Sequence, residues 1–284
     1  MKRNHLILLL ALLFFIGCKK DENPQPTITN TGICSGLSFY KSFPNPKNGV
    51  GYLGAFSHKM ALSNTHIYGI NGDGLFQLDF EGNIKNLLGP AEGVSSVQMD
   101  VDGKLYVFDF SKFRIYDAGF NLLETHIHNG VVDDDYVGLN SADRVVSCEK
   151  TDFDVKIYSY TTDTIIKVFG EFGLNDGQFG TAITRVDGDG IGNIYVDTKS
   201  SSPQIFDKLG NFIGKIETYD YVKTWLGGYV TYGASGVATF KSPDGTNKGT
   251  FYASSGSGFI DVRLSPDQNT LVIATRTEIH VYKK

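Results

Sequence analysis

The chain repeats a pattern of short β-rich segments at intervals of about 40 residues, and this repeat constrains the fold more than any other feature. One set of hydrophobic segments is centred on Tyr68, Tyr106, Val146, Tyr195 and Val272, at intervals of 38, 40, 49 and 77 residues. A second set ends at Leu78, Tyr116, Tyr158, Phe206 and Tyr282, at intervals of 38, 42, 48 and 76 residues. In both sets the last interval equals about two periods, so we expect a degenerate sixth unit within residues 218–256.

The units consist of strands and tight turns. No segment of a dozen residues has the apolar spacing of a helix, and many segments end in turns rich in Gly, Asp and Asn, such as 79–83, 117–121 and 207–211. Gly and Asn supply the positive φ that such hairpin turns require. A period near 40 with about four short strands is typical of a propeller blade, which cannot bury both of its faces alone. The sequence therefore predicts an all-β, six-bladed β-propeller.

The two ends of this domain complement each other. The last unit has strand-like segments at 259–264, 270–275 and 278–283 and then ends one strand short. Residues 37–43 form an isolated strand-like segment before the first unit. We expect the N-terminal strand to complete the last blade, which closes the ring and removes exposed sheet edges.

One unit resembles an NHL repeat. The motif is carried by Val168-Phe169-Gly170, by Asp176 to Phe179, by Gly192 to Asp197 and by Gln204 to Asp207. The unit at 94–127 resembles the repeat more loosely, through residues 102–107 and 115–117. The resemblance implies an NHL-like six-bladed propeller across the domain, although the motif itself covers only about 75 residues.

The N-terminus reads as a lipoprotein signal peptide. Lys2 and Arg3 precede an apolar run from Leu6 to Ile16, which is too short to span a bilayer and has the length of a signal-peptide core. The following Gly17-Cys18 resembles the lipobox of bacterial lipoproteins. This resemblance implies cleavage before Cys18 and acylation of Cys18, which would anchor the chain durably in a lipid bilayer. The predicted organisation is a signal peptide (1–17), a lipidated flexible tether (18–36) and the propeller (37–284).

The net charge argues against a nucleic-acid-binding protein, and the cysteine content argues against a fold held together by disulfides. Loss of Lys2 and Arg3 leaves 24 basic side chains against 31 acidic ones, a formal charge of −7, and no basic cluster longer than a pair remains. Nucleic acid is therefore not an expected partner. Beyond Cys18 only Cys34 and Cys148 remain, and we expect two free thiols because a domain of this length needs no disulfide scaffold.

Few residues are candidates for catalysis or metal binding. A multi-histidine site in the channel is disfavoured, because His126 and His128 fall on a predicted outermost strand and His280 on a third strand. Asp100 and Asp187 follow or end predicted innermost strands and are weak candidates for metal ligands, with calcium the possible cofactor. Asp100, Asp102, Asp187 and Asp189 also fit ordinary turn chemistry, which we prefer. The run 133–135 is expected to be a solvated loop rather than a metal site.

The degenerate fifth blade contains the most conspicuous aromatic segment. Five rings fall within fourteen residues: Tyr219, Tyr221, Trp225, Tyr229 and Tyr232. Aromatic side chains are enriched in contact surfaces, but strands also bury them in blade cores. These five residues are the candidate contact surface, and blade core is the alternative.

Together these features favour binding over catalysis. We expect a lipoprotein of the cell envelope, attached to the outer membrane on its periplasmic or surface face, whose propeller recognises an envelope or outer-membrane protein or another ligand. The alternative is a metal-dependent, lactonase-like hydrolase or lyase with carboxylate ligands in the central channel.

Overall fold

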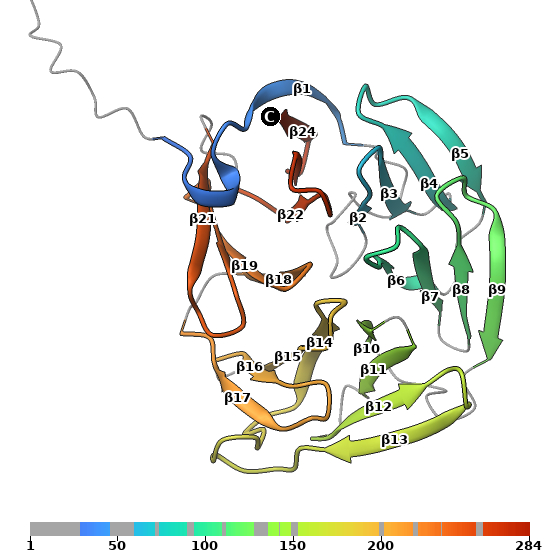
Figure 1. The fold of residues 1–284 in the computed structure, drawn as a ribbon, viewed down its shortest axis with the longest axis vertical. Coiled ribbons are helices and arrows are strands. Elements are labelled where there is room, and N and C mark those ends of the chain that lie inside the picture. Colours follow the sequence, from blue (N-terminus) through green and yellow to red (C-terminus); the bar gives the residue numbers. More distant parts are fainter. Residues whose placement is uncertain are drawn as a thin grey trace, which may run out of the picture.

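The computed structural model describes residues 29–45, 60–71, 74–89, 94–109, 112–127, 136–141, 143–148, 153–198, 202–217, 221–233, 235–253 and 258–284. These residues form six four-stranded antiparallel sheets arranged as the blades of a ring (Figure 1). The six-bladed all-β propeller predicted from the repeat is confirmed.

Each of the first five blades consists of four strands that are consecutive in the sequence. Blade 1 contains β2 (Met60–Leu62), β3 (His66–Asn71), β4 (Gly74–Asp79) and β5 (Ile84–Leu88). Blade 2 contains β6 (Val94–Met99), β7 (Leu105–Asp109), β8 (Lys112–Tyr116) and β9 (Leu122–Ile127). Blade 3 contains β10 (Tyr136–Ser141), β11 (Arg144–Cys148), β12 (Val155–Ser159) and β13 (Thr164–Phe169).

The remaining blades include the irregular unit. Blade 4 contains β14 (Ile183–Gly188), β15 (Ile194–Thr198), β16 (Gln204–Phe206) and β17 (Phe212–Lys215). Blade 5 contains β18 (Tyr221–Trp225), β19 (Gly228–Tyr232), β20 (Val237–Lys241) and β21 (Asn247–Tyr252), so the sixth unit expected within 218–256 is present. Blade 6 contains β22 (Asp261–Leu264), β23 (Thr270–Ala274), β24 (Glu278–Lys283) and β1 (Ser38–Pro44).

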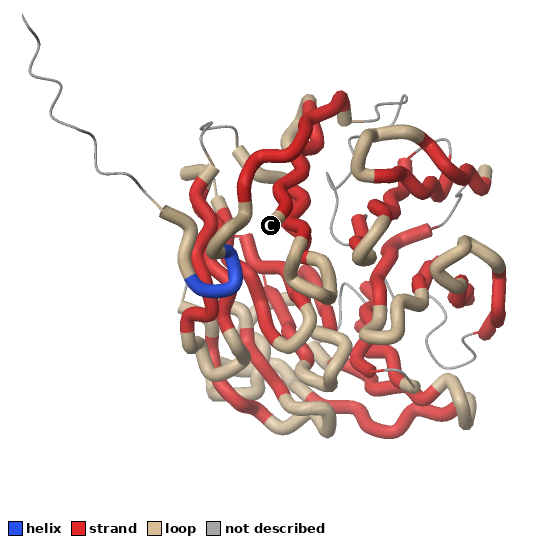
Figure 2. Tube along the Cα trace, turned by 45° about the horizontal axis from the view of Figure 1, so that its top comes forward, coloured by secondary structure: helices blue, strands red, loops and turns tan. Residues whose placement is uncertain are grey.

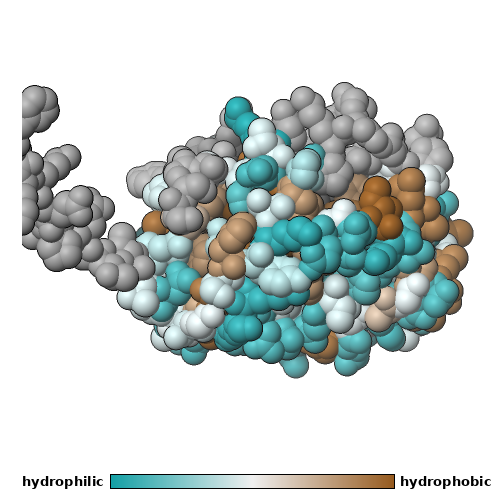
Figure 3. Space-filling view, turned by 90° about the horizontal axis from the view of Figure 1, so that it is seen from above, coloured by the Kyte–Doolittle hydropathy of each residue, from teal (hydrophilic) through white to brown (hydrophobic). Residues whose placement is uncertain are grey.

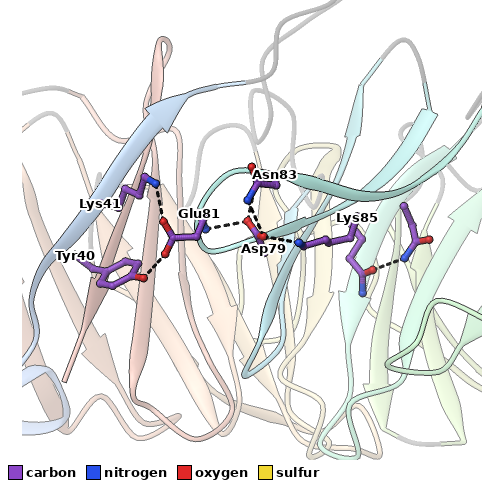
Figure 4. Close-up of polar contacts among 8 residues, drawn as sticks. Tyr40, Lys41, Asp79, Glu81, Asn83 and Lys85 are labelled. Atoms are coloured by element: carbon purple, nitrogen blue, oxygen red, sulfur yellow. Dashed lines mark hydrogen bonds and ion pairs between the residues drawn. The ribbon is translucent and has the colours of Figure 1, made fainter.

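The ring closes through its first strand, as expected. β1 pairs antiparallel with β24, from Ser38 opposite Lys283 to Pro44 opposite Glu278. The same strand also contacts blade 1, because Tyr40 and Lys41 both bind Glu81 in the turn between β4 and β5 (Figure 4). The Lys41 Nζ to Glu81 Oε2 distance is 2.6 Å. β1 therefore joins the last blade to the first.

The hydrophobic core is divided among the six interfaces between neighbouring blades. Each of the six clusters of buried apolar side chains combines residues of two consecutive blades, with blade 6 also packing on blade 1. Between blades 3 and 4, for example, Val146 and Ile157 pack in one cluster with Phe179, Val186 and Val196. A blade is thus stabilised by its neighbours, which explains why the units occur as a ring.

In blades 1, 2 and 4 the turn between the third and fourth strands uses an Asp and an Asn four residues apart. Asp207 Oδ1 accepts hydrogen bonds from the backbone N–H groups of Leu209 and Asn211 at 2.8 and 2.9 Å, and Asp79 makes the equivalent contacts. Gly210 has the expected positive φ of 72°. In blade 2 the corresponding residue is Phe120, with φ of 67°, where we expected Gly or Asn to provide this conformation.

The end of the predicted tether packs against blade 5. The short helical turn η1 (Gly32–Cys34) lies at the edge of the ring (Figure 2). The Thr31 backbone N–H donates to the Thr250 carbonyl of β21 at 3.0 Å, and Cys34 is fully buried. The segment expected to be flexible up to residue 36 is therefore held on the propeller from Asn30 onward.

Cys34 and Cys148 are both buried in different clusters, Cys34 between blades 5 and 6 and Cys148 between blades 3 and 4, and no disulfide joins these two described residues. Among the residues described, no helix is long and apolar enough to cross a bilayer.

Candidate functional site

The C-terminal ends of all six innermost strands surround a cavity at one mouth of the central channel, here called the axial cavity. The space that can hold water-sized molecules is about 70 Å³, and the cavity is partly open to solvent. Apolar side chains from blades 1, 5 and 6 contribute much of its wall, including Met60, Leu62, Trp225, Leu226 and Leu264. Its polar residues include Gln98, Asp100, Asp189, Thr224 and Arg263. An apolar wall with a few convergent polar groups is typical of a ligand site.

A hydrogen-bond network links innermost strands of different blades beside this cavity. Asp187 of β14 is fully buried and accepts hydrogen bonds from Gln98 Nε2 of β6 and, at 2.6 Å, from Thr224 Oγ1 of β18. Gln98 Oε1 in turn accepts from the backbone N–H of Leu139 in β10. The network therefore joins the innermost strands of blades 2, 3, 4 and 5.

Close backbone contact supports the same network. A side chain at Gly188 would place its Cβ 2.0 Å from the Leu139 carbonyl oxygen. Glycine is required here because β10 and β14 approach each other too closely for any Cβ. Gly188 also donates its backbone N–H to Asp187 Oδ1 at 2.9 Å.

Asp100 and Asp189 shape the turns that begin at the cavity. Asp100 Oδ1 accepts from the backbone N–H groups of Asp102 and Lys104 at 2.9 and 2.8 Å, and its Oδ2 accepts from the Tyr106 hydroxyl at 3.2 Å. Asp189 Oδ1 accepts from three backbone N–H groups in its own turn, those of residues 191–193. These are the contacts that the turn interpretation predicts for Asp100 and Asp189, whereas Asp187 binds side chains of other blades.

The weak metal candidates are thus already hydrogen-bonded. The oxygens of Asp100 and Asp187 are bound by protein donors, and a metal ion would have to replace those bonds. Within the described ranges no three His, Cys, Asp or Glu side chains are grouped closely enough to hold a metal ion. The run 133–135 lies outside those ranges.

Burial affects the acid–base properties of these carboxyl groups. Burial raises the pKa of Asp189 to about 6, against the lowering effect of its hydrogen bonds from Asn193, Ile191 and Gly192. Burial likewise raises the pKa of Asp100. In both groups desolvation of the charged form outweighs the turn hydrogen bonds.

The histidines lie away from the axial cavity where their positions are described. His126 is on the outermost strand β9 and His280 on the third strand β24, as predicted, and His66 begins the second strand β3. His58 and His128 lie outside the described residues.

The aromatic segment divides into core and cavity residues. Tyr229 and Tyr232 are 3% and 1% exposed, so their rings belong to the blade core and the contact-surface expectation is wrong for these two. Alternation along β19 and packing against blades 4 and 6 bury them. Trp225 is half-buried and lines the axial cavity, with its Nε1 donating to the Tyr229 carbonyl at 3.1 Å. Tyr219 lies outside the described residues, and for Tyr221 only the backbone position at the start of β18 is described.

The innermost strands carry charges that the sequence analysis did not single out. Arg185 of β14, Lys223 of β18 and Arg263 of β22 are each at least nine-tenths buried. The sequence contained a signal for Arg185 and Arg263. Each lies two residues from an Asp, Asp187 or Asp261, on a strand that was expected to be innermost, and residues two apart on a strand face the same side.

A second candidate surface lies on the outside of the ring. The outermost strands of blades 1 to 3 expose nine aliphatic side chains by 39% to 64%. We call this set the outer belt: Ile84, Leu87 and Leu88 of β5, Leu122, Leu123 and Ile127 of β9, and Ile165, Ile166 and Val168 of β13. Hydrophobic side chains gather toward the right-hand side of Figure 3, the side on which Figure 1 places β5 and β9.

Comparison with known proteins supports the fold. No family model and no curated protein matches the chain. Among solved structures, a chain from the crystal structure of the mitotic checkpoint complex matches with a TM-score of 0.56 and 12% identity, over 95% of this chain and 97% of that chain. The WD40 β-propeller domain of Doa1 matches with a TM-score of 0.51 and 12% identity, over 87% and 97%. The protein is therefore a six-bladed β-propeller similar in fold to WD40 propellers.

Proposed function

We propose that this protein is a lipid-anchored recognition module of a bacterial cell envelope, and that its propeller binds a partner protein through the outer belt. The propeller fold commonly serves protein interaction, and the similar chain from the mitotic checkpoint complex was solved within a complex. The proposal includes the NHL-like character inferred from residues 168–207 and attachment to the outer membrane, on its periplasmic or surface face, through acylated Cys18.

The outer belt is the observation that carries this proposal. Exposed aliphatic side chains are ordinary when scattered, but here they recur on the outermost strands of three consecutive blades. In β5 and β9 every side chain is exposed or half-buried, so the described parts of the chain cover neither strand. Burial of such an apolar belt against a partner is favourable, because it removes apolar surface from water.

The attachment point of the N-terminal segment leaves the belt accessible. The first described residues lie beside β21, to which Thr31 and Asn30 are hydrogen-bonded. In Figure 1, β21 is on the opposite side of the ring from β9. A propeller tethered to a membrane at the β21 side would therefore present the outer belt away from its attachment.

The test is affinity purification of the full-length lipoprotein from native membranes in mild detergent, with quantification of co-purifying proteins. We expect one envelope protein at a fixed ratio to the propeller, and its loss with Leu123→Glu, which places a charge in the middle of the belt. Ile213→Glu is the matched control, because Ile213 of β17 is 45% exposed and lies outside the belt. Recovery of the propeller alone, or equal recovery of the partner with both variants, would refute the proposal.

The anchor is tested separately with Cys18→Ser. Without its acylation site the chain should move from the membrane fraction to the soluble fraction while retaining its far-UV circular dichroism spectrum. A variant that stays in the membrane fraction would contradict lipid attachment at Cys18.

A further inference from the structure

The innermost strands carry their charges on one side of the channel. Within the described parts of β2, β6 and β10 no side chain is charged, whereas β14, β18 and β22 carry Arg185, Asp187, Lys223, Asp261 and Arg263. Three cations thus face two carboxylates on these three strands. A buried charge needs a partner of opposite sign or several hydrogen bonds, so each of these groups should be accounted for.

The two carboxylates are already occupied. Asp187 accepts hydrogen bonds from Gln98, Thr224 and the backbone of Gly188. Asp261 accepts from the Val262 N–H at 2.9 Å and from Arg263 Nη2 at 3.4 Å. Arg185 has an additional carboxylate on the second strand of blade 4, with Asp197 Oδ2 at 3.9 Å from its Nη2.

Arg263 retains unused donor capacity at the axial cavity. Its two hydrogen bonds, to the Thr224 carbonyl and to Asp261, are both 3.4 Å long. Its Nε lies 3.2 Å from Asp261 Oδ1 but makes no hydrogen bond with any described residue. A guanidinium group has five N–H donors in a planar fork that suits a carboxylate. Nη1 and Nη2 each use one of their two N–H groups in these bonds, which leaves one N–H on each atom. The side chain is nine-tenths buried and lines the cavity, where these two N–H groups can bind a ligand.

Lys223 is a second buried cation close to Arg263. Its side chain is only 4% exposed, and within the described residues its Nζ has neither a hydrogen-bond partner nor a carboxylate oxygen within ion-pair distance. It lies on the strand next to β22 and experiences the charges of Asp261 and Arg263. A buried ammonium group without a partner indicates a missing anion or a tightly held water molecule.

We propose that the axial cavity binds a small organic acid, whose carboxylate is held by Arg263 with the charge of Lys223 behind it and whose apolar part lies against the cavity wall. The wall supplies Met60, Leu62, Trp225, Leu264 and Pro266 for that apolar part. Asp100 and Asp189 also line the cavity, and the Oδ1 atom of each accepts hydrogen bonds from the backbone N–H groups of its own turn, which offset part of its negative charge.

The acid–base behaviour of Lys223 makes binding dependent on pH. Burial lowers the pKa of Lys223 to about 7, a shift that Asp261 of β22 and Asp187 of β14 oppose and that Arg263 and Arg185 reinforce. A bound anion favours the charged ammonium group, so binding above neutral pH takes up a proton at Lys223. Affinity should therefore fall as the pH rises from about 7 to about 9.

Titration of the wild-type protein with hexanoate tests the proposal without any substitution. Trp225 is the single tryptophan of the chain and lines the cavity, so its fluorescence reports occupancy directly. We expect a saturable change in emission with hexanoate, with an affinity roughly tenfold or more above those of acetate, hexanol and hexylamine. Equal responses to hexanoate and hexanol, or no saturable response to any of the four compounds, would overturn the proposal.

Two variants then locate the carboxylate. Arg263→Gln should weaken hexanoate binding by roughly tenfold or more, because it removes the fork that receives the carboxylate. Lys223→Met should weaken binding at pH 7 and abolish the fall in affinity at higher pH. Lys215→Met on the outermost strand β17 is the control and should leave both the affinity and its pH dependence unchanged. Unchanged hexanoate binding in the folded Arg263 variant would contradict the assignment.

Discussion

Thr224 Oγ1 donates a 2.6 Å hydrogen bond to Asp187 Oδ2 and so joins the innermost strand of blade 5 to that of blade 4. Asp187 is fully buried, and its other oxygen is bound by Gln98 from blade 2. Because a buried polar group depends on its hydrogen-bond partners, this bond is expected to contribute to the stability of the whole ring.

Thr224→Val should therefore destabilise the protein by about 1 to 3 kcal/mol, since it leaves a buried carboxylate with one donor fewer. The free energy of unfolding, measured by urea titration, is the relevant quantity. Thr125→Val provides the control, because Thr125 is exposed on β9 and keeps its β-branched shape on substitution. A change within about 0.5 kcal/mol is expected for the control, and an equally small change for Thr224→Val would show that the network adds little.

Phe120 has a backbone conformation that residues with a Cβ atom rarely adopt. Its φ of 67° is in the left-handed region, while its ring is buried and stacks on Tyr116 at a centroid distance of 5.4 Å. Both Phe120→Ala and Phe120→Gly lose the ring, but only glycine relieves the backbone. We expect Phe120→Gly to be more stable than Phe120→Ala by about 1 kcal/mol.

The same pair of substitutions at Phe113 should give the opposite order. Phe113 is fully buried in β8 and is not among the residues of positive φ, so glycine only adds flexibility there. Phe113→Ala should be more stable than Phe113→Gly by about 0.5 to 1 kcal/mol. If alanine were also preferred at position 120, the strain assigned to its backbone would be absent.

Asp189 should give the folded protein an unusual dependence on pH. Burial raises the pKa of Asp189 to about 6 from an ordinary 3.8, so the folded state holds this proton more tightly than the unfolded state does. The contribution of Asp189 to stability is therefore greatest below pH 4 and is lost as the pH rises to about 6. Relative to Asp189→Asn, the wild-type protein should lose about 1 to 3 kcal/mol over this range.

Asp207 is the matched control, because it occupies a similar turn that is largely exposed. Some burial raises the pKa of Asp207, but the hydrogen bonds from Asn211 and Leu209 prevail and the net shift is downward. Relative to Asp207→Asn, the wild-type protein should gain stability as the pH rises through the acidic range. Urea titrations at several pH values measure both differences, and the same sign for both residues would contradict the role assigned to burial.

The sequence by itself determined the blades, their number and the closure of the ring. The intervals between Tyr68, Tyr106 and Tyr195 identified the second strands, because each blade repeats the same order of buried apolar strands and turns. The turns at Asp79 and Asp207 followed from the residues within them, since an Asx turn is satisfied by donors two to four positions away. Closure by residues 37–43 followed from counting strands.

Only the tertiary structure decided what meets at the axis. Gln98 and Asp187 are 89 residues apart, and the repeat alone does not determine whether two such side chains reach each other across the channel. The packing of Thr31 against Thr250, 219 residues away, was likewise absent from any local pattern. Tyr229 and Trp225 have similar sequence signals, but one ring packs between two blades while the other lines the axial cavity. Their different surroundings depend on how complete blades pack around the ring, which is a property of the assembled fold rather than of any single repeat.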